Sequence, residues 1–159
     1  MEIVNGKLGK DQIYSLILIS DISFIPEPLS KRVDLKAYAI KLADKATHFY
    51  AMEGEELIGM NCCYMNDSDN KKAFISLICI RPDFIGKGIG TILTNECEKY
   101  AVLKGFAFIE CEVHSENLPS LEMYKKMGYV IDRKMDDHHY IMRKKIQINT
   151  DKENTDKHR

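Results

Sequence analysis

The stretch that decides the fold is AFISLICIRPDFIGKGIGTILTNECEKYA, residues Ala73–Ala101. Its first part, Ala73–Ile80, is almost entirely apolar and contains three isoleucines, which predicts a strand buried on both faces. A proline within a charged turn follows, and then the run Gly86–Gly90. From Ile89 onward the apolar residues recur about every 3.6 residues, which predicts a helix.

The order of strand, glycine turn and helix start favours the binding of a phosphate. The first turn of a helix leaves backbone N–H groups without partners and carries the positive end of the macrodipole. Glycines at positions 86, 88 and 90 remove the side chains that would keep a phosphate away from these groups. Successive amides in such a turn also form a concave nest for anions. A glycine-rich connection without a ligand is the alternative.

Two common phosphate motifs do not match this loop. A P-loop needs a Lys-Ser/Thr pair, whereas Lys87 lies between two glycines. A dinucleotide fingerprint would need glycine where Thr91 stands, so a nucleotide ligand is disfavoured. The remaining pattern, G-x-G-x-G, resembles the coenzyme A pyrophosphate loop of the GNAT superfamily of N-acetyltransferases, written Q/R-x-x-G-x-G/A. Gly88 and Gly90 match its small positions, and Ile85 occupies the Gln/Arg position.

A second segment carries the same resemblance. Residues 117–129, NLPSLEMYKKMGY, are similar to the GNAT pattern N-x-x-[AS]-x-x-x-Y-x-K-x-G-[FY]. The matching residues are Asn117, Ser120, Tyr124, Lys126, Gly128 and Tyr129. The specific resemblance covers roughly residues 71–144, and the first half of the chain agrees in the order of its elements. The chain is therefore identified as a member of this superfamily.

The expected elements form one α/β domain. Helices are predicted at Lys10–Ser20, at Asp34–Ala46 with Asp34 as N-cap, from Ile89 to about Lys104, and at Asn117–Met127. Strands are predicted at His48–Met52, Leu57–Met65, Ala73–Ile80, Phe106–His114, Tyr129–Met135 and Tyr140–Ile148, and Glu2–Val4 is the one candidate for a short first strand. This order predicts the GNAT fold, a single mixed, mostly antiparallel sheet flanked by about four helices. The domain spans residues 1–148, and residues 149–159 are expected to form a charged, disordered tail.

Composition excludes several classes of protein. A length of 159 residues corresponds to about one domain. The formal net charge of −1 argues against a nucleic-acid-binding protein, which would carry a basic excess. No apolar run is long enough to span a membrane, and the N-terminus lacks the basic-then-apolar order of a secretory signal. The sequence predicts a cytoplasmic protein that does not bind membranes.

The cysteines are expected to be buried, reduced thiols. They are Cys62, Cys63, Cys79, Cys97 and Cys111, all in apolar segments and without a C-x-x-C pair. His138 and His139 are adjacent imidazoles with no third ligand, so no metal site is predicted.

The resemblance implies a cofactor, acetyl-CoA, and a role for each matching position. The backbone of Ile78, Cys79 and Ile80 would pair with the pantetheine arm as an added strand would. The amides of Gly86, Lys87, Gly88, Ile89, Gly90 and Thr91 would hold the pyrophosphate. Asn117 would hydrogen-bond the arm, and Tyr124 would lie near the thioester sulfur as general acid to the leaving thiolate.

The general base is less well specified. An alkylammonium has a pKa of about 10.4 and must lose a proton before it attacks. Glu110, Glu112 and His114 share one face of a strand, while Asp137, His138 and His139 lie in the last hairpin. Each of these six residues is a candidate, directly or through water, and Glu112 is the predicted base.

The sequence thus predicts an acetyl-CoA-dependent N-acetyltransferase acting by direct attack of a primary amine of a small molecule, with an amino sugar as first candidate. The alternatives are a protein or peptide amine acetyltransferase and a non-catalytic acyl-CoA-binding module. The loop residues Phe24, Ile25 and Leu29 either plug the core or wall the substrate pocket. A homodimer through strand or helix edges is compatible with the sequence.

Overall fold

The structure, a computed structural model, describes residues 1–147. The predicted tail and the predicted end of the last strand, Ile148, lie outside these residues. One seven-stranded sheet has the order β1-β2-β3-β4-β5-β7-β6. Its strands are β1 (Glu2–Asn5), β2 (Thr47–Glu53), β3 (Glu56–Asp67), β4 (Lys72–Ile80), β5 (Phe108–His114), β6 (Val130–Lys134) and β7 (His139–Lys145).

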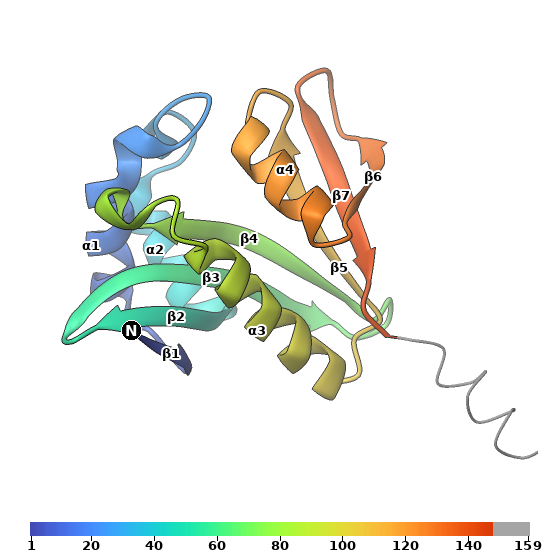
Figure 1. Cartoon of the computed structure of the whole chain (residues 1–159), viewed down its shortest axis with the longest axis horizontal. Helices are drawn as coiled ribbons and strands as arrows, with labels where there is room; N and C mark the ends of the chain where they lie inside the picture. The colour runs from blue at the N-terminus through green and yellow to red at the C-terminus, as the bar shows by residue number, and fades with distance from the viewer. Residues whose placement is uncertain (148–159) are drawn as a thin grey trace, which may run out of the picture.

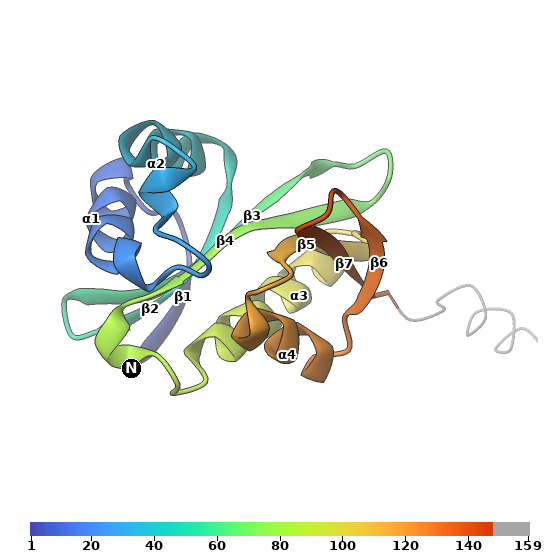
Figure 2. The same cartoon turned by 90° about the horizontal axis from the view of Figure 1, so that it is seen from above.

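The sheet is mixed, as predicted, because β4 and β5 are parallel and all other neighbours are antiparallel. The helices are α1 (Lys10–Ser20), α2 (Leu35–Lys45), α3 (Ile89–Leu103) and α4 (Leu118–Lys126). Helices α1 and α2 pack on one face of the sheet and α3 and α4 on the other (Figure 2). The mixed sheet and helix number confirm the predicted fold class. The short first strand also forms, at Glu2–Asn5.

Local sequence explains where the helices begin. Asp34 caps α2, since the Ala37 N–H donates to its carboxylate at 2.8 Å. Asn117 caps α4 in the same way, accepting from the Ser120 N–H at 3.3 Å, and Pro119 occupies the first turn. Helix α3 has no side-chain cap and starts after Gly88 in a left-handed conformation.

The sheet splits between β4 and β5. Only the first four residues of each strand are paired: Lys72–Ile75 of β4 pair with Phe108–Cys111 of β5. Beyond that point β4 continues along β3, whereas β5 stays paired with β7 as far as His114. Figure 1 shows the two strands side by side at their beginnings and spread apart at their carboxyl ends.

A bulge in β4 coincides with this split. Cys63 pairs with Ile75, but Cys62 pairs with Leu77, which leaves Ser76 as an extra residue in β4. Because of this extra residue, odd-numbered side chains before Ser76 and after it point to opposite faces of the sheet. Ala73 and Ile75 therefore pack with α3 and α4, whereas Leu77 and Cys79 pack with α1 and α2. Both faces of β4 carry buried side chains, as predicted, but in different halves of the strand.

All five cysteines are buried and none forms a disulfide, as expected from the sequence. Burial raises the pKa of Cys79 and of Cys111 to about 12, so both remain thiols rather than thiolates. Within residues 1–147, no helix has the length and apolar character needed to cross a membrane.

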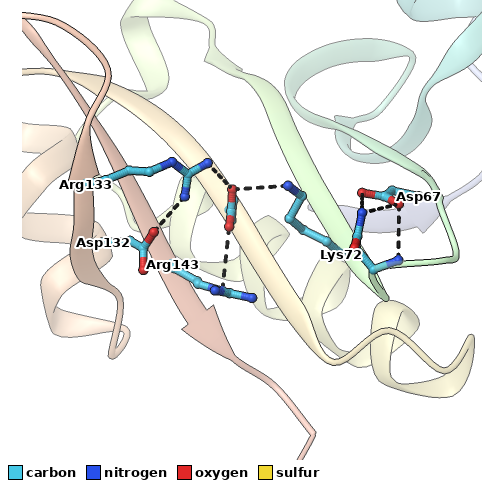
Figure 3. A network of polar contacts seen from close by, with 7 residues as sticks. Asp67, Lys72, Asp132, Arg133 and Arg143 are labelled. Atoms are coloured by element: carbon cyan, nitrogen blue, oxygen red, sulfur yellow. Dashed lines mark hydrogen bonds and ion pairs between the residues drawn. The ribbon is translucent and has the colours of Figure 1, made fainter.

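A buried carboxylate joins the strands on the far side of the split. Glu110 of β5 is 3% exposed, and cations from three other strands surround it. Its carboxylate lies 3.1 Å from Arg133 Nη2, 3.6 Å from Arg143 Nε and 3.7 Å from Lys72 Nζ. Figure 3 shows these three cations converging from β6, β7 and β4. Glu110 thus stabilises the end of the sheet at which β4 and β5 remain paired.

Replacing Glu110 with Gln should destabilise the protein. The substitution leaves three cations without their central anion, but these side chains are a third to a half exposed. We therefore expect a loss of about 1–3 kcal/mol in the free energy of unfolding. Urea unfolding measures this loss. Glu112→Gln, the next position on the same face of β5, is the matched control and should change stability by no more than about 0.5 kcal/mol. Equal losses in the two variants would contradict the structural role of Glu110.

Candidate active site

The free edge of β4 is the first component of the site. Among the described residues, no strand pairs with Ser76–Ile80 on the side that faces β5. Tyr38 of α2 fixes the start of this edge, because its hydroxyl lies 2.7 Å from Ser76 Oγ and 3.1 Å from the Ser76 carbonyl oxygen. Burial raises the pKa of Tyr38, so its hydroxyl stays protonated and able to donate. An extended ligand could pair with this edge as an added strand.

The glycine loop supplies the second component. Gly86 and Gly88 have φ of 84° and 79°, values that residues with a side chain rarely adopt. The first bond of α3 runs from the Ile92 N–H to the Gly88 carbonyl. The backbone amides of residues 86–91 donate no hydrogen bond to an acceptor within residues 1–147. Six unpaired donors at a helix N-terminus form an arrangement that suits a phosphate.

Gly90 has a different role, which is to leave room for side chains of neighbouring elements. A Cβ atom at this position would lie 3.3 Å from Met123 Sδ and 3.8 Å from Ile78 Cγ2. Glycine therefore lets the first turn of α3 approach both β4 and α4. This contact keeps the unpaired amides next to the free edge of β4.

Two adjoining cavities lie along these components. The first, here called the glycine-loop cavity, has a volume of about 420 Å³. Nine of the ten predicted cofactor-binding residues line it: Ile78, Cys79, Ile80, Gly86, Gly88, Ile89, Gly90, Thr91 and Asn117. The tenth, Lys87, does not, and its ammonium lies 5.0 Å from the centre of the Phe84 ring.

The second cavity, the inter-strand cavity, lies between β4 and β5 and has a volume of about 300 Å³. It shares part of its wall with the glycine-loop cavity, namely Phe24, Ile25, Ile78, Asn117 and Ser120. The two cavities therefore adjoin each other, one beside the glycine loop and the other between the strands. Together they suit a long, narrow ligand with phosphates at one end.

One buried hydroxyl supports a polar ligand in the glycine-loop cavity. Ser20, at the end of α1, is 1% exposed and lines this cavity. Among the described residues its Oγ makes no hydrogen bond of standard geometry, and the neighbouring Cys79 thiol is only a weak partner. Since a buried, unpaired hydroxyl is costly, a ligand with polar groups along its arm would stabilise it.

Tyr124 of α4, the predicted general acid, lies in the wall of the inter-strand cavity. It is 5% exposed, and its ring packs 5.0 Å from that of Tyr129. Burial raises its pKa well above the usual value for tyrosine. The hydroxyl is thus protonated throughout the neutral range.

The structure separates the six candidate bases. Glu112, His114 and His139 line the inter-strand cavity together with Tyr124. Glu110 lines neither cavity, because its carboxylate is held by the three cations at the paired end of the sheet. The structure therefore does not bring Glu110 to the site.

Asp137 and His138 also line neither cavity. They lie in the turn between β6 and β7. The proximity of His138 and His139 to each other does not make a metal site by itself. Within residues 1–147 no group of three or more His, Cys, Asp or Glu side chains is arranged to hold a metal ion.

The loop between α1 and α2 both fills the core and walls the cavities. Leu29 is 4% exposed and packs with α1 and α2. Phe24 and Ile25 line both cavities. Both roles considered for this loop therefore occur: Leu29 fills the core, and Phe24 and Ile25 wall the cavities.

Several residues of the site were missed from the sequence. Ser20, Ser76 and Tyr38 were not predicted to take part. Ser76 did give a signal, since it is the only polar residue in the apolar run 73–80. For Ser20 and Tyr38 no local signal exists, because their positions depend on how α1 and α2 pack on the sheet.

Comparison with known proteins agrees with this geometry. The family model described as "Acetyltransferase (GNAT) family" matches residues 12–129. An uncharacterized N-acetyltransferase of Methanocaldococcus jannaschii is 34% identical over 73 residues, which are 45% of this chain and 32% of that protein. The chain thus matches about a third of the length of this relative.

Solved structures show the same fold. Aminoglycoside 6'-acetyltransferase type Ii superposes with a TM-score of 0.78 and 18% identity, covering 94% of this chain and 99% of that one. The ribosomal-protein-S18-alanine N-acetyltransferase of Escherichia coli has a TM-score of 0.74 and 15% identity, over 92% of this chain and 96% of that one. The PaiA N-acetyltransferase of Thermoplasma acidophilum, in complex with coenzyme A, has a TM-score of 0.70 and 20% identity, over 91% of this chain and 99% of that one.

The family match spans most of the chain, and the split sheet, glycine loop and buried tyrosine lie within or beside it. The chain belongs to the GNAT family of acetyltransferases, acyltransferases that use acetyl-CoA.

Proposed function

We propose that the protein is a cytoplasmic N-acetyltransferase that moves the acetyl group of acetyl-CoA to a primary amine of a small molecule. The observation that carries this proposal is that the two cavities adjoin beside β4 and are lined by the residues that the transfer needs. The unpaired amides of residues 86–91 lie at one end, the free edge of β4 runs alongside, and Tyr124 and Glu112 lie at the other end.

Acetyl-CoA, when bound, supplies an activated acetyl group as a thioester. In the proposal the amides of residues 86–91 hold its pyrophosphate, and the backbone of Ile78–Ile80 pairs with its pantetheine arm. The side-chain oxygen of Asn117 already accepts the Ser120 N–H, so its amide nitrogen is the group left to contact the arm. The buried Ser20 hydroxyl gains a partner from the same arm.

Three features of the chain serve the transfer itself. A backbone N–H at about Ile78 stabilises the oxyanion that develops on the carbonyl oxygen. Tyr124 protonates the departing thiolate, whose solution pKa is close to that of cysteine, about 8.5. Glu112 faces the acceptor amine from β5. Alignment of the amine and the thioester in one cavity supplies much of the rate without a covalent intermediate.

The volume and wall of the inter-strand cavity favour a small acceptor. At about 300 Å³, with Phe24 and Ile25 in its wall, it matches a single sugar or amino acid better than a long segment of protein. An amino sugar is the first candidate, which agrees with the fold similarity to the aminoglycoside acetyltransferase. A peptide amine is the second candidate, since the S18-alanine enzyme has the same fold.

Acetyl-CoA should bind to the native protein and bind at least about tenfold more weakly to Gly88→Trp, because the indole would cover the unpaired amides. Isothermal titration calorimetry measures both affinities without using thiol chemistry. The matched control is Gly105→Trp at the other end of α3. Gly105 has φ of 86° and equally open surroundings, but lines neither cavity.

Both glycine variants should lose about 1–2 kcal/mol of stability, the cost of a left-handed residue. Only Gly88→Trp should lose affinity. If the native protein does not bind acetyl-CoA, or if both variants bind it like the native protein, the proposed pyrophosphate site is wrong.

Tyr124→Phe should lower kcat by about 10²-fold or more while acetyl-CoA affinity stays within a factor of about two, because only the proton donor is removed. Acetylated amine is quantified by mass spectrometry, with glucosamine as acceptor. Tyr129→Phe is the matched control, since its hydroxyl bonds Glu98 instead and it lines neither cavity. Native kcat in Tyr124→Phe would show that another group or water protonates the thiolate.

A further inference from the structure

Imidazoles and carboxylates gather at the carboxyl end of β5, beside the inter-strand cavity. His114 ends β5 and lies opposite His139, the first residue of β7. Their rings are 4.9 Å apart and nearly perpendicular. The His138 ring stacks on that of His114, with the ring centres 5.9 Å apart. Of these three rings, those of His114 and His139 line the cavity.

Asp136 fixes the orientation of His139. The His139 Nδ1 atom lies 2.8 Å from Asp136 Oδ1 and 2.9 Å from Oδ2. The His138 backbone N–H also donates to this carboxylate, at 2.8 Å. That N–H first, and the His139 ring second, lower the pKa of Asp136, which is therefore an anion at neutral pH.

An anionic carboxylate only accepts hydrogen bonds, so Nδ1 of His139 must carry the proton. In the neutral ring Nε2 then has a free lone pair. This Nε2 atom lies 3.9 Å from Glu112 Oε1, and both residues line the inter-strand cavity with Tyr124. The nitrogen that can accept a proton is thus next to a carboxylate that can bind a cation.

His114 has the opposite arrangement. Its Nδ1 atom accepts the Glu116 backbone N–H at 3.0 Å. The neutral His114 ring must therefore carry its proton on Nε2, and it has no free lone pair to offer the cavity. Of the two histidines that line the cavity, His139 therefore has a nitrogen lone pair free to accept a proton, and His114 does not.

We propose that His139, positioned by Asp136, is the general base that takes a proton from the acceptor ammonium, and that Glu112 binds this ammonium rather than deprotonating it. The inference rests on the proposed acetyl transfer and changes the role predicted for Glu112. The ammonium loses one proton and becomes a neutral nucleophile, while the imidazole gains that proton on Nε2. The resulting imidazolium lies between Asp136 and Glu112 and, being 23% exposed, can release the proton to solvent.

The electrostatic surroundings of His139 are mixed. Glu112 and His114 face it from β5, Asp136 and His138 adjoin it in the turn, and Arg32 lines the same cavity from the segment before α2. The two carboxylates in direct contact outweigh the one cation across the cavity. This balance favours an ammonium next to Nε2.

The first test needs no acceptor. Long-range ¹H–¹⁵N NMR on the native protein, with His139 assigned by comparison with His139→Ala, reports which ring nitrogen carries the proton. The expected result is the Nδ1–H form for His139 and the Nε2–H form for His114. An Nε2–H form for neutral His139 would overturn the inference, whether or not any amine is acetylated.

The second test is the pH dependence of kcat/KM, with glucosamine and a tetrapeptide beginning with alanine as acceptors. His139→Ala should lose about 10²-fold in kcat and lose the fall in rate at acid pH that protonation of a histidine base produces. Added imidazole should restore part of this activity. Asp136→Asn should also lower kcat and alter the acid side of the profile, whereas the matched Asp137→Asn, in the same turn, should not.

The two proposals fail in different ways. If acetyl-CoA does not bind, the acetyltransferase proposal fails. If acetyl-CoA binds and amine is acetylated, but His139→Ala keeps the native rate and profile, the acetyltransferase proposal stands and the role of His139 is overturned. A loss that occurs in His114→Gln instead of His139→Ala also overturns it. If neither amine is turned over, the NMR result decides.

Discussion

The interrupted pairing between β4 and β5 is the constraint on which the rest of the structure depends. Four residue pairs hold the two strands together, and then Ser76 enters β4 as an extra residue. From there each strand follows a different neighbour, β3 or β7. Within residues 1–147 no strand pairs with Ser76–Ile80 on the side that faces β5, and a cavity opens between the strands. Since unpaired backbone groups are costly when they lose water, this edge is suited to a ligand that pairs with it.

The two ends of β5 show how tertiary contacts assign different roles to similar residues. Glu110 and Glu112 are two positions apart and lie on the same face of one strand. Glu110 lies where the strands are still paired, so three cations reach it and it stabilises the sheet. Glu112 lies beyond the split, where the sheet has opened, and it faces the cavity. The position of each carboxylate relative to the bulge, not its residue type, decides its role.

Much of the fold could be predicted because its signals are local. The periodicity of Lys10–Ser20 predicted α1 to the residue, and the Asp34 N-cap predicted the start of α2. The loop at residues 86–90 and the segment 117–129 predicted the family. The bulge could not be predicted, because the register of β4 depends on which cysteine of β3 faces Ile75 and which faces Leu77. The contact of Asp136, His139 and Glu112 was missed for the same reason, since it requires β5 and β7 to be aligned.

The most direct test of the account is amide hydrogen exchange of β4 with and without acetyl-CoA. At saturating acetyl-CoA, backbone amides within Ser76–Ile80 that face the gap should exchange at least about tenfold more slowly, and so should the amides of residues 86–91. The amides of Lys72–Ile75, which are already in the paired part of the sheet, should not change. Binding of acetyl-CoA without added protection in Ser76–Ile80 would contradict the claim that the split in the sheet exists to receive the cofactor.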